Sequence, residues 1–243
     1  MSQHSAFILK PLSSVIEEAI ASVSALYLKM EAYPLIKYLR EALLLRMTGF
    51  QEQKLKCIMW ELSTDDYQFR YKYLSGSHKF GEGSRYEDKK TVYKCLKKQI
   101  EDFSPNYSID VAVRSRILSD VKIKMDDLFM TTIIKQSMER EYADFNTIYA
   151  GLTARSFGDG DSFIDGNVGQ LSAKRFYEDV LIRERNRIAH NTPSYQANLP
   201  SFNSLNNPND VLRNYFLFYA YLMNIDSIYV ELFKKYQERP ILY

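Results

Sequence analysis

The sequence AKRFYEDVLIRERNRIAH, at positions 173–190, is the stretch that decides the interpretation of the fold. Its apolar side chains recur at the spacing of one helix face: Phe176, Val180, Leu181 and Ile188. Ser172 precedes the stretch, where a hydroxyl can accept a hydrogen bond from the free N–H groups of a helix start. Asn191-Thr192-Pro193 follows it and cannot continue a helix. We therefore predict an amphipathic helix over residues 173–190 with an arginine-rich polar face.

The rest of the chain also favours helices. Only 9 glycines and 7 prolines occur in 243 residues, so turn signals are few. Caps and apolar spacing predict further helices over residues 14–30, 34–47, 51–74, 84–103, 109–120, 125–155 and 208–238, with an interruption allowed within 125–155. No pair of strands is evident. We expect an all-α helical bundle of roughly seven to nine helices, forming a single helical domain over residues 1–243.

Several local features carry this prediction. Ser14 and Ser84 each begin a capping-box pattern, and Thr48-Gly49 is expected to end a helix. Trp60 is expected in the core. The last helix is expected to begin with Asn207 as its cap and Pro208 in its first position. It is lined with apolar and aromatic residues: Leu212, Tyr215, Phe216, Tyr219, Leu222 and Ile225.

Residues 156–170 combine four glycines with three aspartates and predict a loop. Asp159 could begin a calcium loop, which needs an oxygen ligand at its fifth position and a glutamate at its twelfth. Those positions hold Phe163 and Gln170, so the pattern does not match. We expect a flexible surface loop, with a regulatory or substrate-gating role as the alternative. No metal site and no cofactor are expected.

Composition limits the partners. The net charge is only +2, so a nucleic-acid site must be a local patch. Residues 54–98 hold eleven Lys or Arg against six Asp or Glu, which is either such a patch or a solvated helix face. Cys57 and Cys95 match no zinc or redox spacing and predict free, buried thiols in a reducing compartment. The apolar run 215–223 is too short to cross a bilayer and no signal peptide is evident, so we expect a cytoplasmic protein without a membrane partner.

The candidates for chemistry narrow to the end of the 173–190 helix. The chain has no phosphate-binding glycine loop and no Gly-x-Ser-x-Gly elbow, and its three histidines lie far apart in sequence. A helix C-terminus favours a protonated imidazole, so His190 is placed to act as an acid or base near neutral pH. Arg185 can hold a phosphate with two donors. These groups suffice for RNA cleavage by the adjacent 2′-hydroxyl, which DNA lacks.

The residues alone leave a second interpretation open. Arginines near a helix C-terminus often only complement its dipole, and a terminal histidine can simply cap it. Arg185 and His190 are about 140° apart around an ideal helix, whereas Asn186 and His190 share a face. Arg185 must therefore reach around the helix, or the helix must fray at His190, or the two groups must meet across a subunit interface.

The string Arg185-Asn186-Arg187-Ile188-Ala189-His190 resembles the R-x4-6-H signature of the HEPN superfamily, in its form Arg-Asn-x-x-x-His. Its position late in a long helix, followed by a polar loop and one more hydrophobic helix, agrees with that resemblance. The resemblance covers a HEPN-like core over residues 110–243. The N-terminal helices in residues 1–109 remain of unassigned type.

The resemblance implies a metal-independent endoribonuclease that cleaves single-stranded RNA to a 2′,3′-cyclic phosphate and a 5′-hydroxyl. Arg185 would contact the scissile phosphate, His190 would transfer a proton and Asn186 would orient the site. Many HEPN members act in antiviral defence or as toxins. A regulatory partner protein or an antitoxin is therefore a further expectation.

The predicted active site also includes residues near the motif and a second subunit. Arg183 and Arg187 either bind flanking phosphates or are solvated, and Tyr195 either stacks on a base or packs in the core. Cleavage needs both an acid and a base, and the motif holds a single histidine. We therefore expect a homodimer with a composite site at its interface. The alternative is a non-catalytic helical interaction module or an RNA-binding module in a defence or toxin–antitoxin operon.

Overall fold

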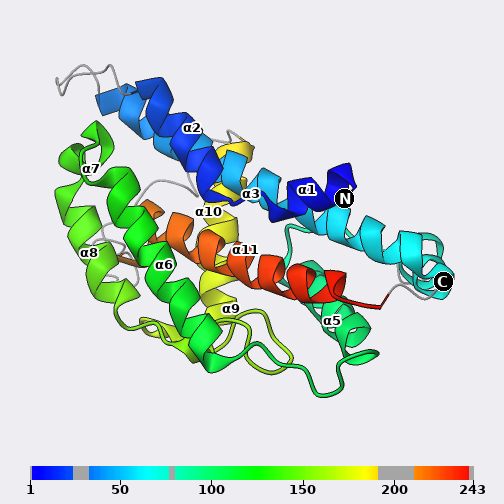
Figure 1. Cartoon of the computed structure of the whole chain (residues 1–243). Helices are drawn as coiled ribbons and strands as arrows, with labels where there is room; N and C mark the ends of the chain where they lie inside the picture. Colours follow the sequence, from blue (N-terminus) through cyan, green and yellow to red (C-terminus); the bar gives the residue numbers. More distant parts are fainter. Residues whose placement is uncertain (1, 24–32, 77–79, 191–210, 241–243) are drawn as a thin grey trace.

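A computed structural model describes residues 2–23, 33–76, 80–190 and 211–240. The described chain is built almost entirely of helices, which lie around the central helix α11 (Tyr215–Gln237) (Figure 1). The helices that pack most extensively on α11 are α1 (Gln3–Leu9), α3 (Tyr33–Asp65), α5 (Tyr86–Glu101), α6 (Val111–Phe129) and α8 (Glu139–Tyr149). The remaining segments are α2 (Ser13–Val23), α4 (Tyr67–Arg70), η2 (Tyr71–Ser75), α7 (Ile133–Ser137), η3 (Ala154–Ser156), α9 (Ala173–Arg175), η4 (Phe176–Ile182) and α10 (Arg183–Ala189). The predicted all-α bundle is confirmed.

Helix α11 is central because it is apolar on every side. All twelve residues from Tyr215 to Asp226 are buried, and a helix that is hydrophobic all round packs in the interior. Two of its buried polar residues have polar partners. The Asn224 amide donates to the Tyr149 hydroxyl oxygen at 2.9 Å, and the Asp226 carboxylate pairs with Lys54 at 2.8 Å. The apolar residues predicted to line the last helix are all buried.

The predicted break at Thr48-Gly49 is wrong, because α3 runs through it without interruption. The Thr48 hydroxyl donates back to the carbonyls of Leu44 and Leu45 at 3.0 Å, so its side chain is satisfied inside the helix. A glycine costs a helix only about 1 kcal/mol, and contacts of α3 with α1, α2 and α11 outweigh that loss. The expectation for Trp60 is also wrong. Its side chain is 58% exposed, on the side of α3 opposite to the buried Leu62.

The interruption allowed within residues 125–155 is present, because Thr132 caps a new start by accepting from the Lys135 N–H at 3.3 Å. Two other helix boundaries differ from the predictions. Ser84 does not cap α5, whose N-cap is Arg85 with no side-chain bond. The expected start at Asn207-Pro208 lies outside the described residues. Residue 214 is not helical, and Asn214 caps α11 by accepting from the Leu217 N–H at 3.0 Å.

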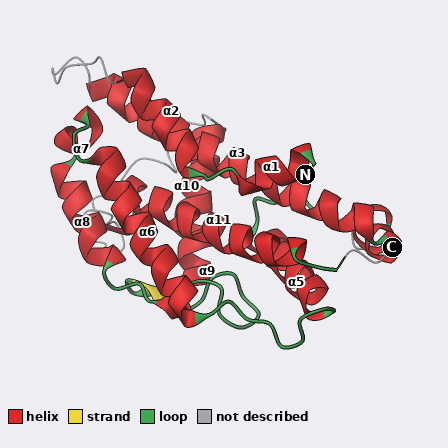
Figure 2. Ribbon diagram, viewed as in Figure 1, coloured by secondary structure: helices red, strands yellow, loops and turns green. Residues whose placement is uncertain are grey.

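The segment 156–170 is not a flexible surface loop. Phe157 and Phe163 are buried in the core, and Arg114 pairs with Asp159 at 3.0 Å. The segment also leads into a strand pair, which corrects the expectation of none: β1 (Asn167–Val168) pairs antiparallel with β2 (Leu171–Ser172) (Figure 2). Gly169 adopts φ 59° in the two-residue turn between them, a conformation that favours glycine.

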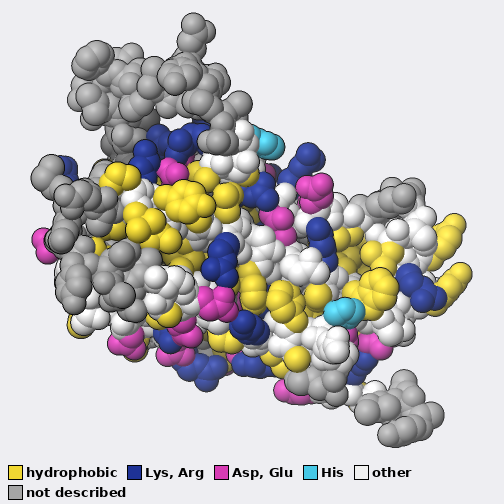
Figure 3. Space-filling model, turned by 90° about the horizontal axis from the view of Figure 1, so that it is seen from above, with side chains coloured by type: hydrophobic (Ala, Val, Ile, Leu, Met, Phe, Trp, Pro, Cys, Tyr) yellow, Lys and Arg dark blue, Asp and Glu magenta, His cyan; other side chains and the backbone are white. Residues whose placement is uncertain are grey.

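The buried apolar residues from Ile8 to Tyr236 form one hydrophobic cluster, with contributions from both sides of position 110. Cys57 and Cys95 are free and buried, as predicted. Among the described helices, none combines the length and apolarity needed to cross a membrane. On the face drawn in Figure 3, described Lys and Arg side chains alternate with Asp, Glu and hydrophobic groups rather than forming one basic surface.

Candidate active site

Helix α10 and the segments before it carry the motif. Ser172 caps the start of α9, as predicted, by accepting from the Arg175 N–H at 3.4 Å. The chain then stays helical to Ala189, with a π-helical stretch in η4. Phe176, Tyr177 and Leu181 are buried there, so this run packs into the bundle along one face. The expected helix over residues 173–190 is therefore present, with wider turns in its middle.

The guanidinium of Arg185 turns toward Asn186. Nη1 donates to Asn186 Oδ1 at 3.0 Å, and Nη2 donates to Glu52 Oε1 on α3 at 3.2 Å. The Arg185 side chain is only 24% exposed, so these two contacts hold it close to the protein surface. Its Nε is buried and has no hydrogen-bond partner among the described residues. Of the three ways in which Arg185 could approach the His190 face, reaching around the helix is the one that its contacts support.

His190 occupies the C-cap of α10 and is exposed. Its backbone N–H donates to the Asn186 carbonyl at 3.1 Å, so the helix is still formed at this position. No described residue hydrogen-bonds to its imidazole. Asn186 and Arg183 are also exposed, at positions i−4 and i−7 from His190, so these three residues share a face of the helix.

Arg187 belongs to a different cluster, centred on Glu184. The Glu184 carboxylate is 5% exposed and accepts hydrogen bonds from Arg187, from Arg213 at 2.8 Å and from the Tyr215 hydroxyl at 2.7 Å. Burial opposes ionisation, yet these hydrogen bonds lower the pKa of Glu184 to about 2. The cluster ties α10 to the start of α11 and engages Nε and Nη2 of Arg187. Tyr195 lies outside the described residues.

A buried polar cluster lies behind Arg185. Lys89 on α5 donates to Gln51 Oε1 at 2.6 Å, and its ammonium lies 5.9 Å from the centre of the Tyr177 ring. Burial lowers the pKa of Lys89 to about 7, although the carboxylates of Glu52 and Asp226 act in the opposite direction. The Glu52 carboxylate therefore interacts with both Arg185 and Lys89.

The structure brings Arg185 and Asn186 together and leaves His190 exposed on the Asn186 face. Within the described chain, no group of three or more His, Cys, Asp or Glu side chains could hold a metal ion. Sequence reasoning missed Glu52 and Lys89, because α3 and α5 are distant in sequence and no motif marks these residues. It also missed Glu184, for which the i,i+3 spacing to Arg187 was the available signal.

Three comparisons with known proteins were made: no family model, no curated protein and no solved structure matches the chain.

Proposed function

We propose that this protein is a metal-independent endoribonuclease of the HEPN type, acting on single-stranded RNA at the C-terminal end of α10. One observation carries the proposal: the Arg185 guanidinium bonds to Asn186, which shares a helix face with the exposed His190. A phosphate binder and a proton carrier are thereby presented on one side of the helix. Both are needed for cleavage by the 2′-hydroxyl.

In the proposed reaction the 2′-oxygen of RNA attacks the adjacent phosphorus, and the bond from phosphorus to the 5′-oxygen breaks. A base takes the proton of the 2′-hydroxyl, and an acid gives a proton to the departing 5′-oxygen. The products are a 2′,3′-cyclic phosphate and a 5′-hydroxyl. Arg185 stabilises the negative charge that grows on the phosphate oxygens, and Asn186 holds the guanidinium toward the His190 face.

A single histidine cannot be base and acid in the same step, so we propose that two copies of the chain supply the two groups. The exposed face with Arg183, Asn186 and His190 is the surface through which a second copy would complete the site. Arg183 is then free to contact a flanking phosphate, while Arg187 mainly supports the helix through Glu184. A defence or toxin role, with a regulatory partner or an antitoxin, follows from the same resemblance.

The proposal is tested by incubating single-stranded RNA with the protein and EDTA. We expect cleavage by the unmodified protein and a loss of about 100-fold or more in His190→Ala and Arg185→Ala, because each removes a group that acts in the transition state. His4→Ala is the matched histidine control and Arg175→Ala the matched arginine control, the latter on the same helical run. Equal cleavage in all four variants would rule out the site.

The Arg185–Glu52 ion pair favours a second candidate function, a helical interaction module in which Arg185 is structural. In that case Arg185→Ala lowers thermal stability and the protein shows no RNA cleavage at any salt concentration. Circular dichroism of the same variants separates the two functions. The catalytic proposal expects His190→Ala to unfold like the unmodified protein, because its side chain is exposed and hydrogen-bonds to no described residue.

A further inference from the structure

A pocket of about 540 Å³ lies between α5 and the helical turns of α4 and η2. We propose that it binds a phosphorylated nucleoside, with the phosphates held by Lys72 and Lys98. This inference does not depend on the proposed ribonuclease function, because the lining residues belong to other helices than the motif.

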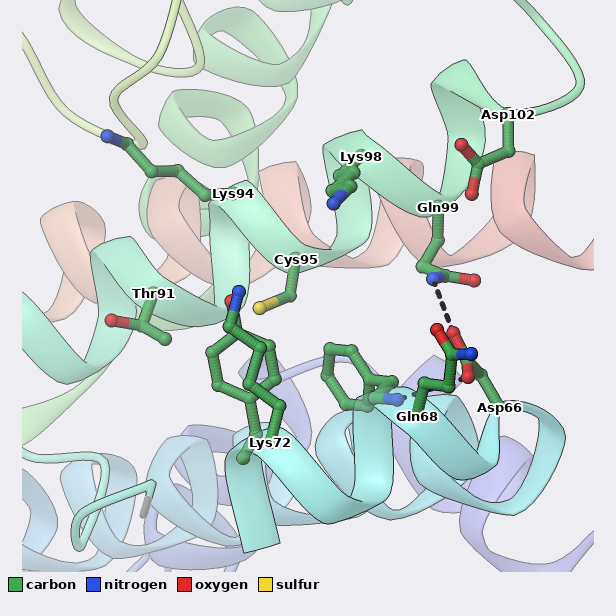
Figure 4. A pocket seen from close by; sticks show the side chains of 11 residues that line it. Asp66, Gln68, Lys72, Thr91, Lys94, Cys95, Lys98, Gln99 and Asp102 are labelled. Carbon is green, nitrogen blue, oxygen red and sulfur yellow. Dashed lines mark hydrogen bonds between the residues drawn. The ribbon is translucent and has the colours of Figure 1, made fainter. Parts of the chain in front are cut away.

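The charges in the pocket point to an anion. Lys72 reaches from η2 toward Cys95 on α5, and Lys94 and Lys98 lie one turn apart on α5 above it (Figure 4). Among the described residues, no carboxylate forms an ion pair with any of these three lysines. Lys72 and Lys98 place two like charges at one hollow, and a bound anion removes their repulsion, whereas Lys94 extends away from Lys72 and Cys95 (Figure 4). Elsewhere in the basic stretch, Lys54 and Lys97 are already paired with aspartates.

The floor and one wall of the pocket are apolar. Cys95 is 6% exposed, and burial raises the pKa of its thiol to about 11, so it stays a neutral surface. The rings of Phe69 and Tyr73, which both line the pocket, pack with centroids 4.7 Å apart and add an aromatic surface to its wall. Such a mixed lining suits a ligand that has a charged end and an aromatic end.

At the end of the pocket opposite to Lys72, the lining side chains offer hydrogen-bond acceptors. Gln99 donates to Asp66 at 3.4 Å and closes the pocket there, and Asp102 and Gln68 stand beside this pair (Figure 4). Carboxylate and amide oxygens accept hydrogen bonds from ribose hydroxyls or from the amino group of a base. The volume lies within the range of small-molecule sites, roughly 300–1,000 Å³.

Isothermal titration calorimetry with the full chain tests the proposal, using ATP, AMP, adenosine and inorganic triphosphate as probes. We expect one ATP per chain, AMP weaker than ATP, and both adenosine and triphosphate at least about tenfold weaker, because each lacks half of the contacts. The double variant Lys72→Ala, Lys98→Ala should weaken ATP at least about tenfold, since each removes a charge-assisted contact. Lys56→Ala, an exposed lysine on α3 that does not line the pocket, is the control and should change affinity by less than about twofold.

A variant without a charge change separates the pocket from general electrostatic attraction. Thr91→Phe places a ring in the pocket and keeps all three lysines, so it should weaken ATP as strongly as the lysine variant. Circular dichroism checks that each variant is folded. The proposal is overturned if ATP does not bind, if triphosphate binds as well as ATP, or if Thr91→Phe binds ATP like the unmodified chain. Competition by long single-stranded RNA alone, with no binding of ATP, would assign the lysines to a nucleic-acid surface instead.

Discussion

Glu184→Gln is the substitution whose effect on stability follows most directly from the contacts of α10. The carboxylate is almost fully buried and accepts hydrogen bonds from two arginines and one tyrosine hydroxyl. Its pKa is lowered from 4.5 to about 2, and each pKa unit corresponds to about 1.36 kcal/mol. The shift alone amounts to about 3.4 kcal/mol. Solvent screens the half-exposed Arg213 and the one-third-exposed Arg187, so we expect Glu184→Gln to lower the free energy of unfolding by about 2–3 kcal/mol at neutral pH.

The pH dependence gives the same prediction a second check. Because the pKa of Glu184 is lower in the folded chain, its contribution is complete above pH 4.5 and is lost as the pH falls toward 2. Urea unfolding followed by far-ultraviolet circular dichroism should therefore show a gap between the unmodified protein and Glu184→Gln that closes with acid. Asp179→Asn, an exposed member of an i,i+4 pair with Arg175, is the control and should cost less than about 0.5 kcal/mol. A gap below about 0.5 kcal/mol at neutral pH, or one that stays constant down to pH 2, would refute the reasoning.

Three further predictions concern the buried Lys89, the buried Phe163 and the exposed Trp60. Because the buried Lys89 has a lowered pKa in the folded chain, the free energy of unfolding should rise by about 1.4 kcal/mol per pH unit between about pH 7 and 10. Lys89→Met should remove this contribution to the slope. Equal slopes for the two proteins in urea titrations would contradict the prediction. Phe163→Ala should cost about 3–5 kcal/mol of unfolding free energy, since its ring is fully buried under the 156–170 segment, and a loss below about 1 kcal/mol would mean that the segment is not docked. Trp60 should emit like an indole in water and be quenched readily by acrylamide, because it is 58% exposed; a blue-shifted, protected emission would contradict that placement.

The helical class of the fold could be predicted because its evidence is local. The apolar run of α11 and the capping hydroxyl of Ser172 are readable from neighbouring residues, and both behave as expected. Where an element depends on distant contacts, the prediction was wrong. Thr48-Gly49 resembles a helix end, yet packing of α3 against other helices, among them α1, α2 and α11, keeps it helical. Trp60 is hydrophobic enough for a core, yet its position in the helical register turns it outward.

For the candidate site, too, the local motif could be predicted from the sequence, whereas contacts between distant residues could not. Arg185, Asn186 and His190 could be selected because they form one short motif, and ideal helix geometry sets the backbone positions of Arg185 and His190 about 140° apart. What the sequence could not indicate is the contact that turns Arg185 toward Asn186, because its partner Glu52 is 133 residues away. The packing of residues 156–170 against the core could not be predicted for a related reason. Its glycines and aspartates are typical of a mobile loop, and only the tertiary structure shows Phe157 and Phe163 in the core.

The chemical nature of the cleavage ends tests the central claim most directly. Single-stranded RNA is incubated with the full chain in EDTA, beside a DNA strand of the same sequence, and the fragments are analysed by mass spectrometry. The proposed use of Arg185 and His190 predicts 2′,3′-cyclic phosphate and 5′-hydroxyl ends from RNA and an intact DNA strand, since DNA lacks the attacking hydroxyl. Cleavage of DNA, fragments with 5′-phosphate ends, or an intact RNA strand would contradict it.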